Sequence, residues 1–165
     1  MRYLGVDLGE KRTGLALGDS QTRLATPVEV IEIPLSLAGG GPLIEAIVRS
    51  YDRLIGPSSP GAVVIGLPLN MDGTDSRQTR VIRSFAARVQ ARLAKQVHLQ
   101  DERLTSADAD WAMARSDLTH QQKKERRDAL AAAAILRDYL AGLARPGPSR
   151  DDTDLPDNLQ PDGDR

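Results

Sequence analysis

Residues 3–17 read YLGVDLGEKRTGLAL, and this stretch sets the first two elements of the expected fold. Its first part alternates in the two-residue period of a β-strand, with apolar side chains on one face and Asp7 on the other. A turn through residues 9–14 leads into Leu15-Ala16-Leu17, which predicts an antiparallel hairpin. Asp7 therefore ends a well-formed first strand, although aspartate is a poor strand residue.

The rest of the chain alternates between predicted strands and helices. Further strands are expected at residues 28–33, 62–67 and 97–104. Helices are expected at 43–54, at 76–95 with Val81, Phe85, Val89 and Leu93 on one stripe, after Ser106, and finally up to Leu143. Three strands in a meander followed by strand–helix alternation predict an α/β fold, a five-stranded mixed sheet with helices on both faces.

Composition excludes several classes of site. The 165 residues predict one domain, and 40% hydrophobic residues can form a core. The absence of cysteine excludes disulfides, thiolate zinc sites and a thiol nucleophile, and two histidines are too few for a histidine metal cage. Any metal would be held by oxygen. The longest apolar run, Ala129–Leu136, is too short to span a bilayer and no signal sequence is evident, so a cytoplasmic protein without membrane contact is expected.

The net charge of −1 hides an asymmetry. Residues 150–165 carry six aspartates against two arginines, a charge of −4, which leaves +3 on residues 1–149. We expect a folded domain over residues 1–145 and a disordered acidic tail over 146–165, because the tail has too few apolar residues to offset its ordering entropy. The tail could serve solubility or mimic nucleic-acid charge.

Three carboxylates stand in unusual places. Asp7 ends a strand, Glu102 shares a predicted strand face with His98, and Asp128 heads the apolar stripe of the last helix. Each has a plainer interpretation: Asp7 could cap the next turn, Asp101 beside Glu102 could do the same, and Asp128 could be stabilised by the helix dipole. A capping-box start at Thr119 weakens the last interpretation.

If the last helix lies against the sheet near Asp7 and Glu102, the three acids can converge. Hard divalent cations would offset their repulsion, since Mg²⁺ takes oxygen ligands and keeps positions for water and phosphate. Two such ions, about 3.5–4 Å apart, can activate a water and stabilise the leaving oxygen in phosphodiester hydrolysis. This chemistry needs neither cysteine nor histidine.

Four segments resemble, in order, the motifs of the YqgF/RuvX family: 6–14 (VDLGEKRTG), 66–74 (GLPLNMDGT), 101–105 (DERLT) and 128–132 (DALAA). Members of that family are proposed Holliday junction resolvases, also described as proposed nucleases that mature the 5′ end of pre-16S ribosomal RNA. The resemblance covers roughly residues 1–143, and four motifs in order make it specific. Small departures at Ser106 and at residues 75–77 touch no proposed ligand.

The resemblance implies an RNase H-like fold in which the carboxylates come together on the sheet. By position, Asp7 would bridge two Mg²⁺ (or Mn²⁺) ions, Glu102 would ligate one, and Asp128 would complete the site from the last helix. It also implies structured nucleic acid as the substrate, branched DNA or precursor ribosomal RNA.

Cations flanking the acids are candidates for binding phosphates: Lys11, Arg12, Arg77, Arg80, Arg103, Lys123, Lys124 and Arg127. The plainer interpretations are solvated turn residues for Lys11 and Arg12, neutralisation of Glu102 for Arg103, and solvated helix faces for the others. Aromatic residues make up 3% of the chain, so recognition by phosphate geometry and substrate shape is favoured over base stacking. Such binding should weaken steeply with salt.

The sequence thus favours a metal-dependent endonuclease. One alternative is a non-catalytic nucleic-acid-binding or ribosome-assembly module. A phosphotransferase related to the sugar kinases and actin is a further alternative, but that architecture needs two such domains and a second glycine-rich phosphate loop. Symmetric cutting of a four-way junction would require a two-fold homodimer.

Overall fold

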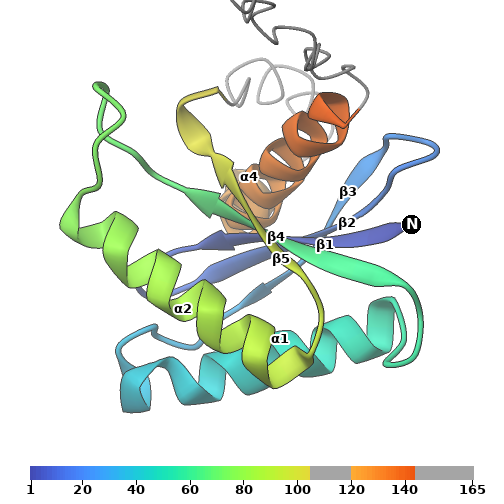
Figure 1. Ribbon diagram of the computed structural model, residues 1–165, viewed down its shortest axis with the longest axis horizontal. Coiled ribbons are helices and arrows are strands. Elements are labelled where there is room, and N and C mark those ends of the chain that lie inside the picture. The colour runs from blue at the N-terminus through green and yellow to red at the C-terminus, as the bar shows by residue number, and fades with distance from the viewer. Residues whose placement is uncertain (105–119, 144–165) are drawn as a thin grey trace, which may run out of the picture.

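Five strands form one mixed sheet in the order β3-β2-β1-β4-β5 (Figure 1). The computed structural model describes residues 1–104 and 120–143. The strands are β1 (Arg2–Leu8), β2 (Thr13–Asp19), β3 (Ala25–Ile31), β4 (Gly61–Leu67) and β5 (Val97–Asp101). The first three pair antiparallel, whereas β4 runs parallel to β1 and β5 runs parallel to β4. The predicted meander followed by crossovers is confirmed.

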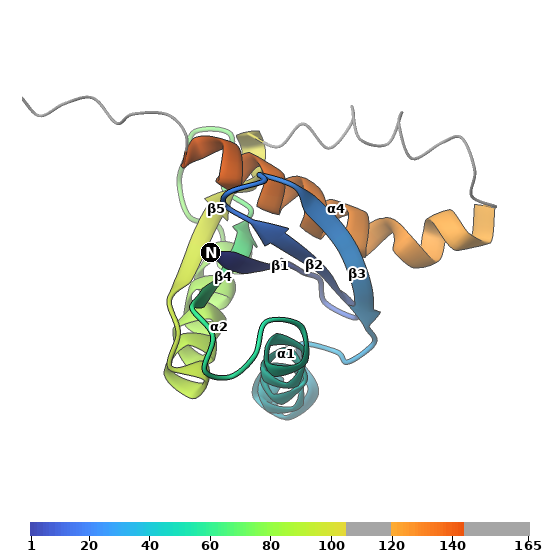
Figure 2. The same cartoon turned by 90° about the vertical axis from the view of Figure 1, so that its right-hand side faces the viewer.

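Helices cover both faces of the sheet, as predicted. Helices α1 (Gly41–Leu54) and α2 (Arg77–Leu93) lie on one face and α4 (His120–Gly142) lies on the other (Figure 2). A short 3₁₀ turn, η1 (Leu37–Gly40), leads into α1. Of the helices within the described ranges, none combines the length and the apolarity needed to cross a bilayer. The acidic tail and the helix expected after Ser106 lie outside the described residues.

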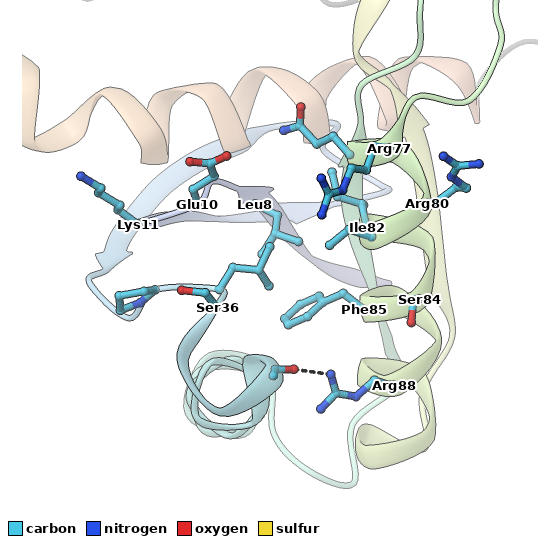
Figure 3. A pocket seen from close by; sticks show the side chains of 15 residues that line it. Leu8, Glu10, Lys11, Ser36, Arg77, Arg80, Ile82, Ser84, Phe85 and Arg88 are labelled. Atoms are coloured by element: carbon cyan, nitrogen blue, oxygen red, sulfur yellow. Dashed lines mark hydrogen bonds between the residues drawn. The ribbon is translucent and has the colours of Figure 1, made fainter.

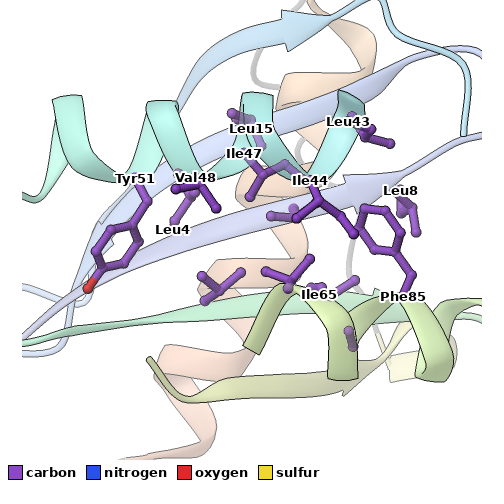
Figure 4. Packing of buried hydrophobic residues seen from close by; sticks show 14 of the residues in the cluster. Leu4, Leu8, Leu15, Leu43, Ile44, Ile47, Val48, Tyr51, Ile65 and Phe85 are labelled. Atoms are coloured by element: carbon purple, nitrogen blue, oxygen red, sulfur yellow. The ribbon is translucent and has the colours of Figure 1, made fainter. Parts of the chain in front are cut away.

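The larger core lies between the sheet and helices α1 and α2. Alternate residues of β1, including Leu4 and Leu8, meet Ile47 of α1 and Phe85 of α2 there (Figure 4). A second cluster fills the opposite face, where Ala132, Ile135 and Leu136 of α4 pack on β1, β2 and β4. This alternation points Leu8 into the first core and turns Asp7 toward α4.

Three predicted details are wrong. The third strand covers Ala25–Ile31 rather than residues 28–33. Val81 is 46% exposed, because the buried stripe of α2 runs through Ile82, Phe85 and Val89 instead. The fifth strand ends at Asp101 rather than continuing to residue 104. The Asp101 carboxylate accepts a hydrogen bond from the Arg103 main-chain N–H at 2.9 Å, and this side chain-to-backbone turn ends the strand, so Glu102 begins the 3₁₀ turn η2 (Glu102–Leu104).

The close approach of α4 to the sheet depends on glycines. A Cβ on Gly14 of β2 would overlap the main-chain carbonyl of Asp128, and a Cβ on Gly5 of β1 would lie 3.0 Å from the carbonyl oxygen of Ala132. Neither neighbour is a flexible side chain, so neither can yield cheaply. The glycines therefore set how closely Asp128 comes to β1 and β2.

We predict that Gly14→Ala destabilises the protein by about 1–3 kcal/mol or more, because the added methyl group must push the α4 backbone away from β2. Urea unfolding followed by circular dichroism measures the effect. Gly41→Ala is the matched control, since a Cβ there meets nothing within 4 Å. Equal stability of the two variants would contradict the close packing described here.

Candidate functional site

Asp7 occupies the centre of the candidate site. It lies opposite Gly14 in the β1–β2 register, at the end of β1, and faces the first described side chains of α4. Burial raises the pKa of Asp7 to about 6, and the nearby negative charge of Asp128 adds to this effect. The positive charge of Arg127 acts in the opposite direction. Asp7 is thus a partly desolvated carboxyl group with charged neighbours on α4.

Glu102 reaches the site from the turn after β5. Its carboxylate lies so close over Gly66 of β4 that a Cβ on that residue would overlap Oε1. Burial raises the pKa of Glu102 to about 7, with further contributions from the negative charges of Asp7 and Asp101. Gly66 thus leaves the space that the Glu102 carboxylate occupies beside Asp7.

Asp128 enters from the opposite side, on α4. Its Oδ2 lies 3.0 Å from Nε of Arg12, which stands in the β1–β2 turn. The same oxygen is buried and accepts no hydrogen bond, so the guanidinium is close enough for charge pairing but its N–H does not point at Oδ2. Asp128 therefore has an incompletely satisfied oxygen beside Asp7.

The fold brings Asp7 near Asp128 and near Glu102, but it does not arrange the three carboxylates around a single ion position. Asp7 is coupled electrostatically to Asp128 on one side and to Glu102 on the other. Within the described residues, no three His, Cys, Asp or Glu side chains are arranged to hold a single ion. Asp7 interacts electrostatically with both other acids, and the three carboxylates are called the acid row below.

The predicted cations divide between the two faces of the sheet. Arg12 and Arg127 lie beside the acids. Lys11, Arg77 and Arg80 instead line a cleft on the α1/α2 face. The side chains of Lys123 and Lys124 lie outside the described ones. Nucleic-acid binding by any of these residues stays a prediction.

Arg103 holds the loop between β4 and α2. Its guanidinium donates to both carboxylate oxygens of Asp101 and to the main-chain carbonyls of Asn70 and Met71, the last at 3.0 Å. The hydrogen bond from Arg103 lowers the pKa of Asp101. Within the loop, Gly73 N–H donates to the Asn70 carbonyl at 2.8 Å. Arg103 therefore has the structural role that the sequence left open, although it pairs with Asp101 rather than with Glu102.

Sequence reasoning missed the glycines that make room for the acids. Gly14 and Gly66 lie within the motifs at residues 6–14 and 66–74, but a motif does not show which atoms approach them. Gly14 is paired with Asp7 on the neighbouring strand, and Gly66 lies under the Glu102 carboxylate. Both positions depend on strand register. Sequence reasoning also missed Arg88, which lines the cleft with Arg77 and Arg80. Arg88 follows Arg77 by eleven residues and Arg80 by eight, and this helical spacing is the signal that could have identified it.

We predict that Asp7→Asn stabilises the metal-free protein increasingly as pH rises. A carboxyl group whose pKa is raised on folding binds its proton more tightly in the folded state, so its ionisation costs stability as pH increases. For Asp7 the window runs from the ordinary value of 3.8 to about 6. The gain of the variant over the unmodified protein should grow across this window to about 3 kcal/mol at most.

Urea unfolding in EDTA at several pH values between 4 and 8 measures this difference. Asp52→Asn, which removes an exposed carboxylate on α1, is the control. A stability difference that stays constant with pH, or that favours the unmodified protein at pH 8, would contradict the burial and crowding of Asp7.

We also predict that Arg103→Ala loosens the loop at residues 68–75 without unfolding the protein, because the two carbonyls and Asp101 lose their shared donor. Amide hydrogen exchange at Gly73 should become at least several-fold faster. Arg92→Ala, which removes an exposed pair with Glu45, is the control. Unchanged exchange at Gly73 would show that Arg103 does not hold the loop.

Comparisons with known proteins show the family to which the chain belongs. A family model described as "RuvX: Holliday junction resolvase" matches residues 1–142. A relative from Maridesulfovibrio salexigens is 37% identical over 141 residues, which are 86% of this chain and 98% of the relative. Another, from Anaeromyxobacter sp. (strain K), is 39% identical over 140 residues, which are 85% and 96% of the two chains. Both relatives are provisionally named pre-16S rRNA nucleases.

Solved structures show the fold. Thermus thermophilus RuvC in complex with a Holliday junction substrate matches with a TM-score of 0.55 at 15% identity, over 87% of this chain and 97% of RuvC. A second RuvC structure from the same organism gives 0.52 at 12% identity, over 87% and 96%. The predicted RNase H-like fold is confirmed. Because the family model and the relatives cover most of the described chain, this protein belongs to the RuvX family of nucleases.

Proposed function

We propose that this protein is a metal-dependent endonuclease that hydrolyses phosphodiester bonds in structured nucleic acid, with Asp7, Glu102 and Asp128 as its catalytic residues. One observation carries the proposal: three acids from β1, from the turn after β5 and from α4 are crowded into a partly desolvated row. Their mutual repulsion costs stability, and a structural role would not call for it.

The residues present fit divalent cations. All three side chains are carboxylates, the hard oxygen donors that Mg²⁺ and Mn²⁺ take. Asp128 Oδ2 is buried without a hydrogen bond, and Gly66 leaves room for Glu102 beside Asp7. The carboxylates of Asp7, Glu102 and Asp128 would hold such ions, and the ions would offset the repulsion that raises the pKa of Asp7 and Glu102.

Ions bound there would supply a water nucleophile at neutral pH and positive charge for the leaving oxygen. The chain's own residues hold the carboxylates in place through strand register and the glycine contacts. The Arg12 guanidinium, whose Nε lies 3.0 Å from Asp128 Oδ2, offsets part of the charge of that carboxylate. Arg127, close enough to Asp7 to lower its pKa, is placed to contact a phosphate approaching the acids.

The names of similar proteins support a substrate class for this proposal. The family model is described as a Holliday junction resolvase, and the relatives are provisionally named for pre-16S rRNA. We propose that branched DNA, precursor 16S RNA or both are cut in the cytoplasm. A two-fold homodimer would permit symmetric cutting of a junction, and analytical ultracentrifugation tests for it.

We predict that Asp7→Asn, Glu102→Gln and Asp128→Asn each reduce Mg²⁺- or Mn²⁺-dependent cleavage at least about 100-fold, because each removes a ligand charge worth several kcal/mol. Cleavage of a four-way DNA junction and of a precursor 16S RNA is measured beside binding of both. Binding should persist in all three variants.

Asp52→Asn, an exposed acid on α1, is the matched control and should cut at the unmodified rate. Unchanged cleavage by Asp7→Asn would overturn the proposed site. If the unmodified protein binds both substrates yet cuts neither with either metal, the protein is a non-catalytic binding or assembly module. If the unmodified protein cuts one of the two substrates and the three acid variants do not, that substrate is the one on which the proposed site acts.

A further inference from the structure

A cleft of about 1350 Å³ opens on the α1/α2 face of the sheet, opposite the acids. Its walls are the β1–β2 turn, the segment before α1 and the first half of α2 (Figure 3). Leu8, the residue after Asp7, lies in its lining. The cleft and the acid row therefore meet at the same end of β1, separated by the thickness of the sheet.

The lining combines positive charge with apolar surface. Lys11 stands on one side of the cleft and Arg77 and Arg80 on the other, and Arg88 donates a hydrogen bond to the Gly39 carbonyl deeper along α2 (Figure 3). Among the described lining residues, Glu10 alone is acidic. Apolar side chains lie between the charged ones: Leu8, Leu35, Val81, Ile82 and Phe85.

The wall nearest the acids is held in place by the main chain. Gly9 N–H donates to the Arg12 carbonyl at 3.1 Å, which closes the turn. Leu35 N–H donates to the Glu10 carbonyl at 2.9 Å, which ties the segment before α1 to that turn. The same turn thus presents Arg12 to the acid row and Lys11 to the cleft.

We propose that this cleft binds an unpaired single strand of the nucleic-acid substrate, continuing from the phosphate at the acids over the β1–β2 turn. This inference rests on the proposed function, because it assumes that the strand in the cleft belongs to the molecule being cut. It goes beyond that function by assigning a second binding region and by naming single-stranded substrate flanks as its ligand.

The mixed lining favours a single strand over a paired arm. A duplex keeps its bases stacked inside and presents mainly phosphates to a protein. The apolar floor of the cleft, where Val81 is 46% exposed, would contribute nothing to such contacts. An unpaired nucleotide exposes both its phosphate and its base. The phosphate can contact Arg77 and Arg80, and the base can pack on the apolar floor of the cleft.

The test uses the full-length protein with two fluorescent RNA hairpins that differ only in a single-stranded extension. EDTA is added to remove the divalent ions that the proposed cleavage requires. Fluorescence anisotropy should show the unmodified protein binding the extended hairpin on the order of tenfold more tightly than the blunt one. The double variant Arg77→Gln/Arg80→Gln should lose this preference. Its salt slope on the extended hairpin should fall by about 1.4, for two phosphate contacts on a single strand.

Arg83→Gln/Arg92→Gln is the matched control, because it removes two charges from the same helix outside the cleft. It should keep the preference. Val81→Glu places a carboxylate at an exposed lining position while all the arginines remain, and it should lose the preference with an unchanged melting temperature. Equal affinity of the unmodified protein for both hairpins, or an equal loss in the cleft and control double variants, would overturn the proposal.

The two proposals fail separately. If Asp7→Asn leaves cleavage intact while the cleft variants lose the single-strand preference, the catalytic site is wrong and the binding cleft stands. If Asp7→Asn abolishes cleavage while the cleft variants bind like the unmodified protein, the cleft proposal is wrong and the nuclease site stands.

Discussion

The main-chain contact between α4 and β2 at Gly14 is the constraint on which the site depends. Because residue 14 has no side chain, the carbonyl of Asp128 can lie directly against the sheet. That approach places the Asp128 carboxylate next to Asp7, which is paired with Gly14 in the register of β1 and β2. Further along α4, Ala132 lies against Gly5 of β1 and Leu136 packs in the second core, so the contact at Asp128 is set together with the packing of the helix residues that follow it.

The close approach of the acids lowers the folding stability through electrostatic repulsion and desolvation. Burial and mutual repulsion raise the pKa of Asp7 and of Glu102, which means that the ionised forms are held at the expense of folding stability. Arg12 and Arg127 offset part of the negative charge. A cluster of acids that lowers folding stability is the pattern expected where function, rather than stability, selects the residues.

The end of β1 contributes side chains to both faces of the sheet. Successive side chains of a strand point in opposite directions, so Asp7 belongs to the acid row under α4 and Leu8 belongs to the cleft beside α2. The turn that follows repeats this division with Lys11 and Arg12. One short segment thereby connects the proposed chemistry with the proposed strand-binding surface.

The sequence by itself determined the strand pattern of residues 3–17, the mixed topology and the choice of Asp7, Glu102 and Asp128 as unusual carboxylates. These features are local, since they follow from side-chain periodicity and from acids that violate it. The tertiary structure decided what lies next to what. That Arg12 pairs with Asp128, that Arg103 holds residues 70 and 71 and that Gly66 makes room for Glu102 all join segments far apart in the chain. Such contacts depend on strand register and helix placement, which the packing of the whole sheet fixes and a local pattern does not contain.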